Sequence, residues 1–210
     1  QEFAKSPALD HRFGFSRRHC LVAGMGLALA KAFKGRGAEV YVVSGPVSLD
    51  ILSEGFHFFP IHSASEMYAA AKSIHEQMDI CVFAAAVADY APAVVATEKI
   101  KKQEGDLSIH LKKNIDIAYE LGKSKRQGQI HVGFALETEN EIEHAKLKIQ
   151  KKNLDLIVLN SLNDEGAGFG KATNKITFID KSFKIEPMPL KPKEEVAKDI
   201  LKKIIGLYHA

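Results

Sequence analysis

The 210-residue sequence predicts an α/β fold with a mostly parallel sheet. Short apolar runs alternate along the chain with segments whose apolar residues recur at helical spacing. The runs are apolar throughout rather than at every second position, which is typical of parallel strands buried on both faces. Glycine, proline or polar residues separate the segments, as expected where the chain turns.

The first half of the chain carries five of these elements. Helical spacing predicts helices over residues 25–33, which two glycines end, and over residues 64–77. Apolar runs predict strands over residues 39–44, 57–61 and 80–87. A Gly-Pro turn ends the first of these strands.

The second half continues the alternation. We expect a short helix at residues 115–122, a strand at 130–135, a helix at 141–152 and a strand at 154–159. Strands and helices in this order predict a Rossmann-like three-layer sandwich, in which helices cover both faces of the sheet.

The end of the chain departs from this alternation. Residues 175–179 and 184–187 predict a C-terminal β-hairpin across a DKS turn, and residues 193–207 predict a helix with one apolar stripe. We find no linker, repeat or low-complexity segment in the sequence. We therefore expect a single domain over residues 1–210.

Composition excludes several classes of protein. The chain is 46% hydrophobic and 26% charged, which indicates a globular core rather than disorder. A net charge of +3 is too small to indicate nucleic-acid binding but suits small anionic substrates. Two cysteines, Cys20 and Cys81, do not support a disulfide framework, so a reducing compartment is expected. Because we see neither a membrane-spanning run nor a signal-peptide pattern, we expect a cytoplasmic protein.

Polar residues gather where three predicted strands end. Asp89 follows one strand, Phe134 and then Glu137 lie at the end of the next, and Asn160 closes a third. In open α/β sheets, ligands bind outside the carboxyl ends of the strands. Polar residues end most buried strands, so no single end identifies a site. Three together favour a ligand site without naming a reaction.

Two groups of lysines add positive charge. Lys99, Lys101 and Lys102 lie in a predicted loop, and Lys148 and Lys152 lie four residues apart on one face of a predicted helix. Paired lysines on one face suit a polyphosphate, although a solvated surface helix more often explains such spacing.

Several segments in order resemble one enzyme family. They are AAAVADYAP with EKIKK, LKKNIDI, GFALETEN, KNLDLIVLN and GAGF. Their ordered set is similar to phosphopantothenoylcysteine synthetase (phosphopantothenate–cysteine ligase), the synthetase part of the bacterial bifunctional coenzyme A flavoprotein. No single motif is specific, because pairs such as GF and KK are common.

The resemblance implies a ligase reaction. Members of the family join 4′-phosphopantothenate to L-cysteine, and bacterial members use CTP with Mg²⁺ or Mn²⁺. The carboxylate attacks the α-phosphorus to give an acyl-cytidylate and pyrophosphate, and the cysteine amine then displaces CMP. Such chemistry needs positive charge against the phosphates, which lysines, backbone N–H groups and metal supply. The resemblance also implies a homodimer and, on a longer chain, a flavin-dependent decarboxylase domain.

The matching motifs assign roles to five residues of this chain. By the resemblance, Asp89 binds the nucleotide, and Lys99 contacts it and supports formation of the intermediate. Phe134 packs on the nucleotide, and Lys148 and Lys152 bind its triphosphate. The loop over residues 101–105 corresponds to a mobile flap above the site.

One further segment matches the family in part. Asn114 would join Lys99 among the catalytic residues, and the backbone from Asn114 onward would recognise the pyrimidine. The cofactor-binding positions that follow it are Ile115, Asp116, Ile117 and Ala118. Ile115 replaces a proline that would preset the helix start, so we expect lower local rigidity. The ligands of the metal stay unassigned.

The N-terminal segment departs from the family pattern. The family has a first strand, a glycine-rich turn and then a segment like NHSSGKMG, whose Asn and backbone hold the intermediate. Here GFSRRHCLVAG takes the place of the serine-rich segment, and we expect no first strand before it. Truncation, misassignment, a local frameshift or divergence with lost activity would each give this pattern. Arg12 matches only weakly.

Two alternatives follow from these departures. An NAD(P)-dependent oxidoreductase is suggested by CLVAGMGLALAKAF, but Leu29 occupies the last glycine position and Ser44 stands where a ribose-binding acid belongs. A non-catalytic relic of the synthetase would bind CTP without turnover.

Overall fold

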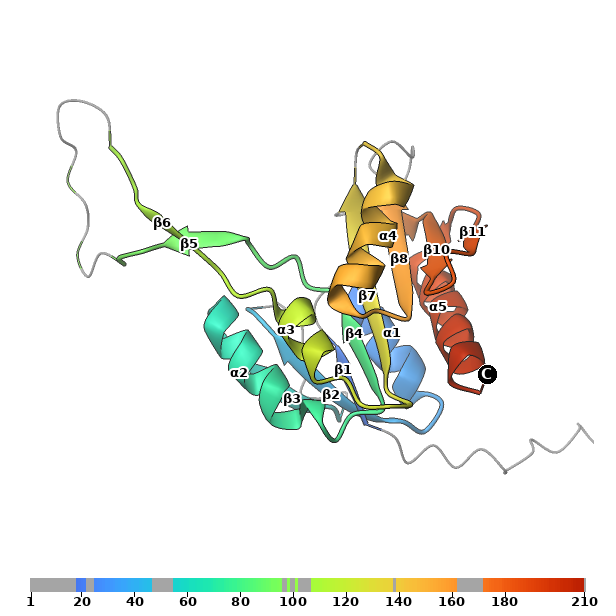
Figure 1. Ribbon diagram of the computed structural model, residues 1–210. Coiled ribbons are helices and arrows are strands. Elements are labelled where there is room, and N and C mark those ends of the chain that lie inside the picture. The colour runs from blue at the N-terminus through green and yellow to red at the C-terminus, as the bar shows by residue number, and fades with distance from the viewer. Residues whose placement is uncertain are drawn as a thin grey trace, which may run out of the picture.

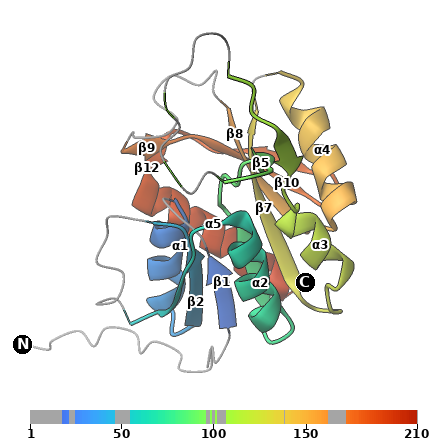
Figure 2. The same cartoon turned by 90° about the vertical axis from the view of Figure 1, so that its left-hand side faces the viewer.

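A computed structural model of the chain describes residues 18–21, 25–46, 55–95, 98, 101, 107–137, 139–161 and 172–209. These residues form an α/β sandwich in which one large sheet lies between two layers of helices, as Figure 1 and Figure 2 show. The predicted fold class is therefore confirmed. Across the described residues, we find no helix that is long and apolar enough to cross a membrane.

The large sheet has eight strands in the order β11-β10-β8-β7-β4-β1-β2-β3. Neighbours from β8 to β3 pair in parallel, whereas β10 pairs antiparallel with both β8 and β11. The strands of the sheet are β1 (Arg18–Leu21), β2 (Glu39–Ser44), β3 (His57–Pro60), β4 (Ile80–Phe83), β7 (Ile130–Glu137), β8 (Leu156–Ser161), β10 (Ile176–Asp180) and β11 (Ile185–Pro187).

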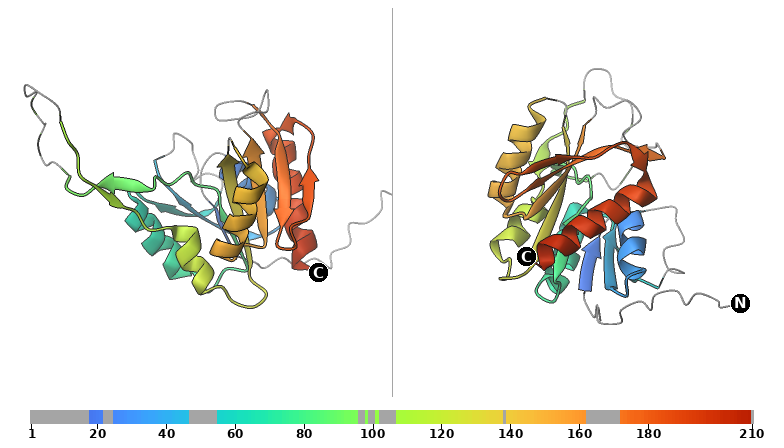
Figure 3. Two further views of the ribbon diagram at one scale, coloured as in Figure 1. Left: turned by 45° about the horizontal axis from the view of Figure 1, so that its top comes forward. Right: turned by 90° about the vertical axis from the view of Figure 1, so that its right-hand side faces the viewer.

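Within the described residues, five helices cover the sheet. They are α1 (Met25–Lys34), α2 (Ala64–His75), α3 (Ile117–Lys123), α4 (Glu141–Lys152) and α5 (Lys193–Tyr208). Helices α1 and α5 pack on one face, and α2, α3 and α4 pack on the other. Figure 3 shows α5 crossing the first face beside α1.

Successive side chains of a strand point to opposite faces of the sheet, so each strand contributes to the core on both faces. On β4, Ile80 and Val82 pack toward α1 and α5, whereas Cys81 packs toward α2 and α3. The apolar stripe of α5 is buried against the first face, with Ile200 and Ile204 fully covered. This arrangement confirms the predicted C-terminal hairpin and helix.

A capping box explains where α2 begins. The Ser63 hydroxyl accepts a hydrogen bond from the Glu66 N–H at 3.2 Å, and a Glu66 carboxylate oxygen accepts from the His62 N–H at 2.8 Å. Both contacts satisfy N–H groups that have no partner within a first helical turn.

Two small ribbons lie outside the large sheet. Strands β5 (Tyr90–Pro92) and β6 (Leu111–Lys113) pair antiparallel, as do β9 (Thr173–Asn174) and β12 (Lys191–Pro192). The β5–β6 ribbon projects from the body of the molecule (Figure 1). Sequence patterns did not predict either ribbon, because each strand is only two or three residues long.

One predicted element needs correction. The strand predicted over residues 80–87 ends at Phe83, where the chain leaves the sheet. Its continuation is rich in alanine, which has low β propensity, and the chain there runs toward β5. Strand β1 forms at Arg18–Leu21, inside the segment GFSRRHCLVAG, and lies between β2 and β4. The expectation that no strand precedes this segment falls outside the described residues.

Candidate active site

A cavity of about 450 Å³ lies beyond the end of β4 and beside β7, between helices α2, α3 and α4. Its walls include four lysines, Lys113, Lys148, Lys151 and Lys152, and two aspartates, Asp89 and Asp116. Parallel strands place their carboxyl ends on one side of the sheet, and the cavity lies on the side where the sequence predicted a ligand site. The excess of lysines favours an anionic ligand.

Asn114 connects two walls of the cavity. Its backbone N–H donates to the Asp89 carbonyl at 2.8 Å, and its side-chain amide donates to the Ala88 carbonyl at 2.8 Å. These bonds fix the spacing between the exposed Asp89 and the segment that begins α3. Asn114 therefore positions the segment that begins α3 relative to Asp89.

Asp116 organises the entrance to α3. It is the N-cap residue, and its Oδ1 accepts from the Tyr119 N–H at 3.2 Å. Its Oδ2 lies 3.1 Å from the Lys152 ammonium. A phosphate that binds Lys152 therefore competes with Asp116 for that cation.

Lys148 is oriented by a second carboxylate. Its ammonium donates to Glu137 at the end of β7, and His144 Nδ1 lies 3.5 Å from the other oxygen of Glu137. Lys148 and Lys152 lie one turn apart on α4, and both line the cavity. Lys148 and Lys152 therefore line the same cavity. Lys148 is paired with Glu137 of β7, and Lys152 is paired with Asp116 at the start of α3.

The remaining predicted positions differ in exposure. Ile117 is buried, whereas Ile115 and the half-buried Ala118 and Phe134 stand at the cavity wall. Phe134 also packs against the main core, so its ring is supported from behind. Lys99 lies outside the described residues, so its predicted role stays a prediction.

Two parts of the site were not found from the sequence. Lys151 lines the cavity beside the predicted lysine pair, and its position next to Lys152 was the only available signal. His75 and Cys81 line the inner end of the same cavity, and no motif includes them. Asn160, which we placed at a strand end, is not among the described residues that line the cavity. Its Oδ1 accepts a hydrogen bond from the Asn174 side-chain amide at 2.9 Å.

Comparison with known proteins relates this site to one family. The family model described as "DNA/pantothenate metabolism flavoprotein C-terminal domain" matches residues 23–207. The chain is 43% identical over 183 residues to the coenzyme A biosynthesis bifunctional protein CoaBC of Bacillus subtilis (strain 168), covering 87% of this chain and 45% of that protein. It is 50% identical over 185 residues to a cysteine/cysteine sulfinic acid decarboxylase of an unknown prokaryotic organism, covering 88% and 52% respectively. The chain thus spans about half the length of these relatives.

Solved structures agree with the sequence comparison. A crystal structure of the C-terminal domain of a CoaBC protein superposes with a TM-score of 0.76 at 30% identity, covering 93% of this chain and 97% of that one. A Cab2 variant in complex with phosphopantothenate-cysteine shares the fold at a TM-score of 0.73 and 15% identity, with 92% and 87% covered. From the family match and these identities we conclude that the chain belongs to the family of the DNA/pantothenate metabolism flavoprotein C-terminal domain, the domain that ends CoaBC proteins.

Proposed function

We propose that this domain joins 4′-phosphopantothenate to L-cysteine, using CTP through an acyl-cytidylate and releasing pyrophosphate and CMP. One observation carries the proposal: Asp89, Asn114, Asp116, Phe134 and both paired lysines line a single cavity. Family membership supports the same reaction. A cavity of this size and charge suits a nucleotide with its phosphates.

Different residues of the cavity wall would have different roles in the proposed reaction. Lys148 and Lys152 would hold the triphosphate, since ammonium groups form charge-assisted hydrogen bonds with phosphate oxygens. Phe134 and the backbone of Ile115–Ala118 would position the cytosine base. CTP held in this way would present its α-phosphorus in a fixed position to the phosphopantothenate carboxylate, which lowers the entropic part of the barrier.

The cavity also fits the divalent cation that this reaction would take, Mg²⁺ or Mn²⁺. Mg²⁺ in nucleotide sites is bound by one or two carboxylates and by the phosphates. Asp89 exposes its carboxylate on the cavity wall, whereas Asp116 is already bonded to Tyr119 and Lys152. Asp89 would therefore hold the ion, which would neutralise charge on the phosphates.

The first experiment is pyrophosphate release with 4′-phosphopantothenate and Mg²⁺, with either CTP or ATP, in the presence and absence of cysteine. We expect release that requires phosphopantothenate and prefers CTP. Lys99→Gln should slow this release roughly 10²-fold, the effect of losing one preorganised electrostatic donor. Release at the wild-type rate would remove Lys99 from the mechanism.

The alternatives have distinct outcomes in the same assay. CTP binding without any release would identify a non-catalytic relic of the synthetase. An NAD(P)-dependent oxidoreductase is not favoured, because the family is a different one and because the buried Ser44 ends β2, where a ribose-binding acid would be required.

We propose further that the domain works in the cytoplasm as a homodimer. The β5–β6 ribbon and the residues next to it support the dimer, since they carry exposed apolar side chains, Tyr90, Val94, Val95, Leu107, Ile109 and Leu111. Monomers rarely expose contiguous apolar surface of this kind. We expected residues 175–187 to form part of the dimer surface, and that remains a prediction.

Because the relatives are about twice as long, we also propose that a flavin-dependent decarboxylase domain accompanies this one in a longer chain.

A further inference from the structure

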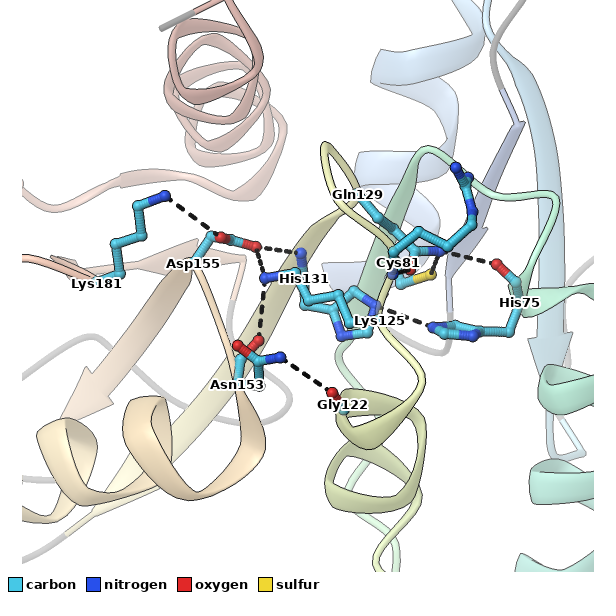
Figure 4. Close-up of polar contacts among 10 residues, drawn as sticks. His75, Cys81, Gly122, Lys125, Gln129, His131, Asn153, Asp155 and Lys181 are labelled. Atoms are coloured by element: carbon cyan, nitrogen blue, oxygen red, sulfur yellow. Dashed lines mark hydrogen bonds and ion pairs between the residues drawn. The ribbon is translucent and has the colours of Figure 1, made fainter.

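A cluster of two histidines and a cysteine, drawn in Figure 4, adjoins the candidate active site, because His75 and Cys81 line its cavity. His75 is the last residue of α2, Cys81 belongs to β4 and His131 belongs to β7. Their exposed fractions are 2%, 3% and 0%. One potential ligand atom from each residue lies within 4.8 Å of the other two.

The backbone holds these side chains together. Cys81 and His131 are register partners on neighbouring parallel strands, so their side chains project from the same face of the sheet. Gln129 fixes the end of α2 above them: its amide nitrogen donates to the His75 carbonyl and to the Met78 carbonyl, each at 2.8 Å. The cluster is therefore arranged before any ligand arrives.

Hydrogen bonding among the described residues leaves His131 incompletely satisfied. Its Nε2 lies 3.0 Å from His75 Nε2, but its buried Nδ1 has no hydrogen-bond partner in the described part of the chain. A buried polar atom without a partner is unfavourable. The pairing with His75 therefore leaves one polar atom of this buried histidine unsatisfied.

One tautomer of His75 suits a metal ligand. The Ser124 oxygen lies 3.5 Å from His75 Nδ1, and the Ser124 hydroxyl can donate to the Leu121 carbonyl at 3.3 Å. With its proton on Nδ1, His75 would direct the lone pair of Nε2 toward His131. A hydrogen bond on the outer nitrogen is the usual support of a metal-binding histidine.

Electrostatics keeps both rings neutral. Burial, with additional effects of Lys125 and His75, lowers the pKa of His131 to about 3, and burial followed by the charge of Arg126 lowers the pKa of His75. Lys125 is itself paired with Asp155 at 2.5 Å, so its charge is compensated. The C-terminal end of α2, which carries a partial negative charge, also faces the cluster.

We propose that His75, Cys81 and His131 form a binding site for a thiophilic transition-metal ion of the Zn²⁺ class. Two nitrogens bound at about 2.0–2.1 Å in a tetrahedral site lie roughly 3.3 Å apart, close to the spacing of the two Nε2 atoms. A set of two imidazoles and one thiolate suits zinc rather than Mg²⁺, which prefers oxygen ligands. The site is thus distinct from that of the nucleotide's cation.

The cavity supplies access and the fourth ligand. His75 and Cys81 both line it, so an ion can enter from there, and a water molecule can complete the tetrahedron. The Cys81 thiol gives its proton to solvent when the Zn–S bond forms, and the two neutral imidazoles lose none. The bound ion would connect the end of α2 to β4 and β7.

The test uses Co²⁺ as a spectroscopic substitute on the complete domain, first freed of metal with a chelator. Wild-type protein should bind one Co²⁺ per chain and show intense visible bands of tetrahedral cobalt together with a near-ultraviolet thiolate-to-cobalt band. Zn²⁺ should displace the Co²⁺ and raise the Tm, because a ligand that binds only the folded state stabilises it. Failure of the wild-type protein to give a tetrahedral spectrum would overturn the proposal without any mutation.

Variants assign the ligands. Cys81→Ser should abolish the thiolate band, and it or His131→Gln should weaken Co²⁺ binding more than about 100-fold, since even lost outer partners cost 10–100-fold. The exposed His57→Gln is the matched control and should bind normally. Cys20 is the register partner of Cys81 on β1, so Cys20→Ser tests which cysteine is the ligand and should keep the thiolate band. Circular dichroism in chelator verifies that each variant is folded. A thiolate band that survives Cys81→Ser but disappears in Cys20→Ser would contradict the assignment.

Discussion

The Asp155 carboxylate lies in the interior between the start of β8, β7 and the segment after α3. Its Oδ2 accepts from the His131 N–H at 2.7 Å and from the Lys125 ammonium at 2.5 Å, and both charged side chains are about nine-tenths buried. Lys181 approaches the other oxygen at 4.0 Å (Figure 4). The ion pair thus connects segments that are far apart in sequence, which is why no sequence pattern indicated it.

Removal of the Asp155 carboxylate should lower the free energy of unfolding. Asp155→Ala removes the counter-ion of the buried Lys125 ammonium, which keeps the Asn153 carbonyl as an acceptor at 3.1 Å, and leaves the His131 N–H without Asp155 as its acceptor. We expect a loss of about 3–5 kcal/mol in the free energy of unfolding. Urea denaturation measures this loss. Lys125→Met with Asp155→Asn should recover part of it, because the double variant buries no charge. A loss below about 1 kcal/mol for Asp155→Ala would show that water reaches the pair.

At the scale of elements, the walls of the cavity depend on how closely α3 approaches α4. A Cβ on Gly122 of α3 would lie only 2.3 Å from the Lys152 carbonyl oxygen at the end of α4. The Asn153 side-chain amide also donates to the Gly122 carbonyl at 3.0 Å. The contact places Asp116 and Lys152 on facing walls, so the geometry of the site depends on a residue that has no side chain.

Gly122→Ala should therefore separate the two helices. The added methyl group meets backbone rather than a flexible side chain, and we expect a loss of about 1–3 kcal/mol in the free energy of unfolding, the usual effect of overpacking. Gly206→Ala in α5 is the matched control, since nothing lies within 4 Å of its added Cβ. That variant should gain about 0.5–1 kcal/mol from helix propensity. Equal effects of the two substitutions in urea denaturation would argue against a tight α3–α4 contact.

For the molecule as a whole, the order of long elements was predictable and the short ones were not. The helices over Glu141–Lys152 and Lys193–Tyr208 follow apolar spacing that persists for three or more turns, so pattern alone located them within a residue or two. Strand β1 and the β5–β6 ribbon form because neighbouring segments pair with them. The family motifs located most of the cavity wall, whereas His75 and His131 come together only through the tertiary fold.

The proposed dimer makes a prediction at this scale. Leu111 of β6 and Ile109, two residues before it, are both more than half exposed. If a second copy covers them, sedimentation equilibrium should give a dimer for the wild-type domain and a folded monomer for Ile109→Lys with Leu111→Lys. Lys112→Ala is the control and should remain dimeric. A wild-type monomer at all concentrations would contradict the proposal.

The contact between α1 and α5 also affects biosynthesis. Leu29 and Phe33 of α1 share one core with Ile200 and Ile204 of α5, although the ribosome makes the two helices at opposite ends of this domain. Until the residues of α5 have left the exit tunnel, the apolar sides of α1 and of the nascent sheet lack their cover. Such surface attracts chaperones and other nascent chains. Completion of this core must therefore wait for nearly the whole domain to be translated, and translation that stops before α5 would leave the apolar side of α1 exposed.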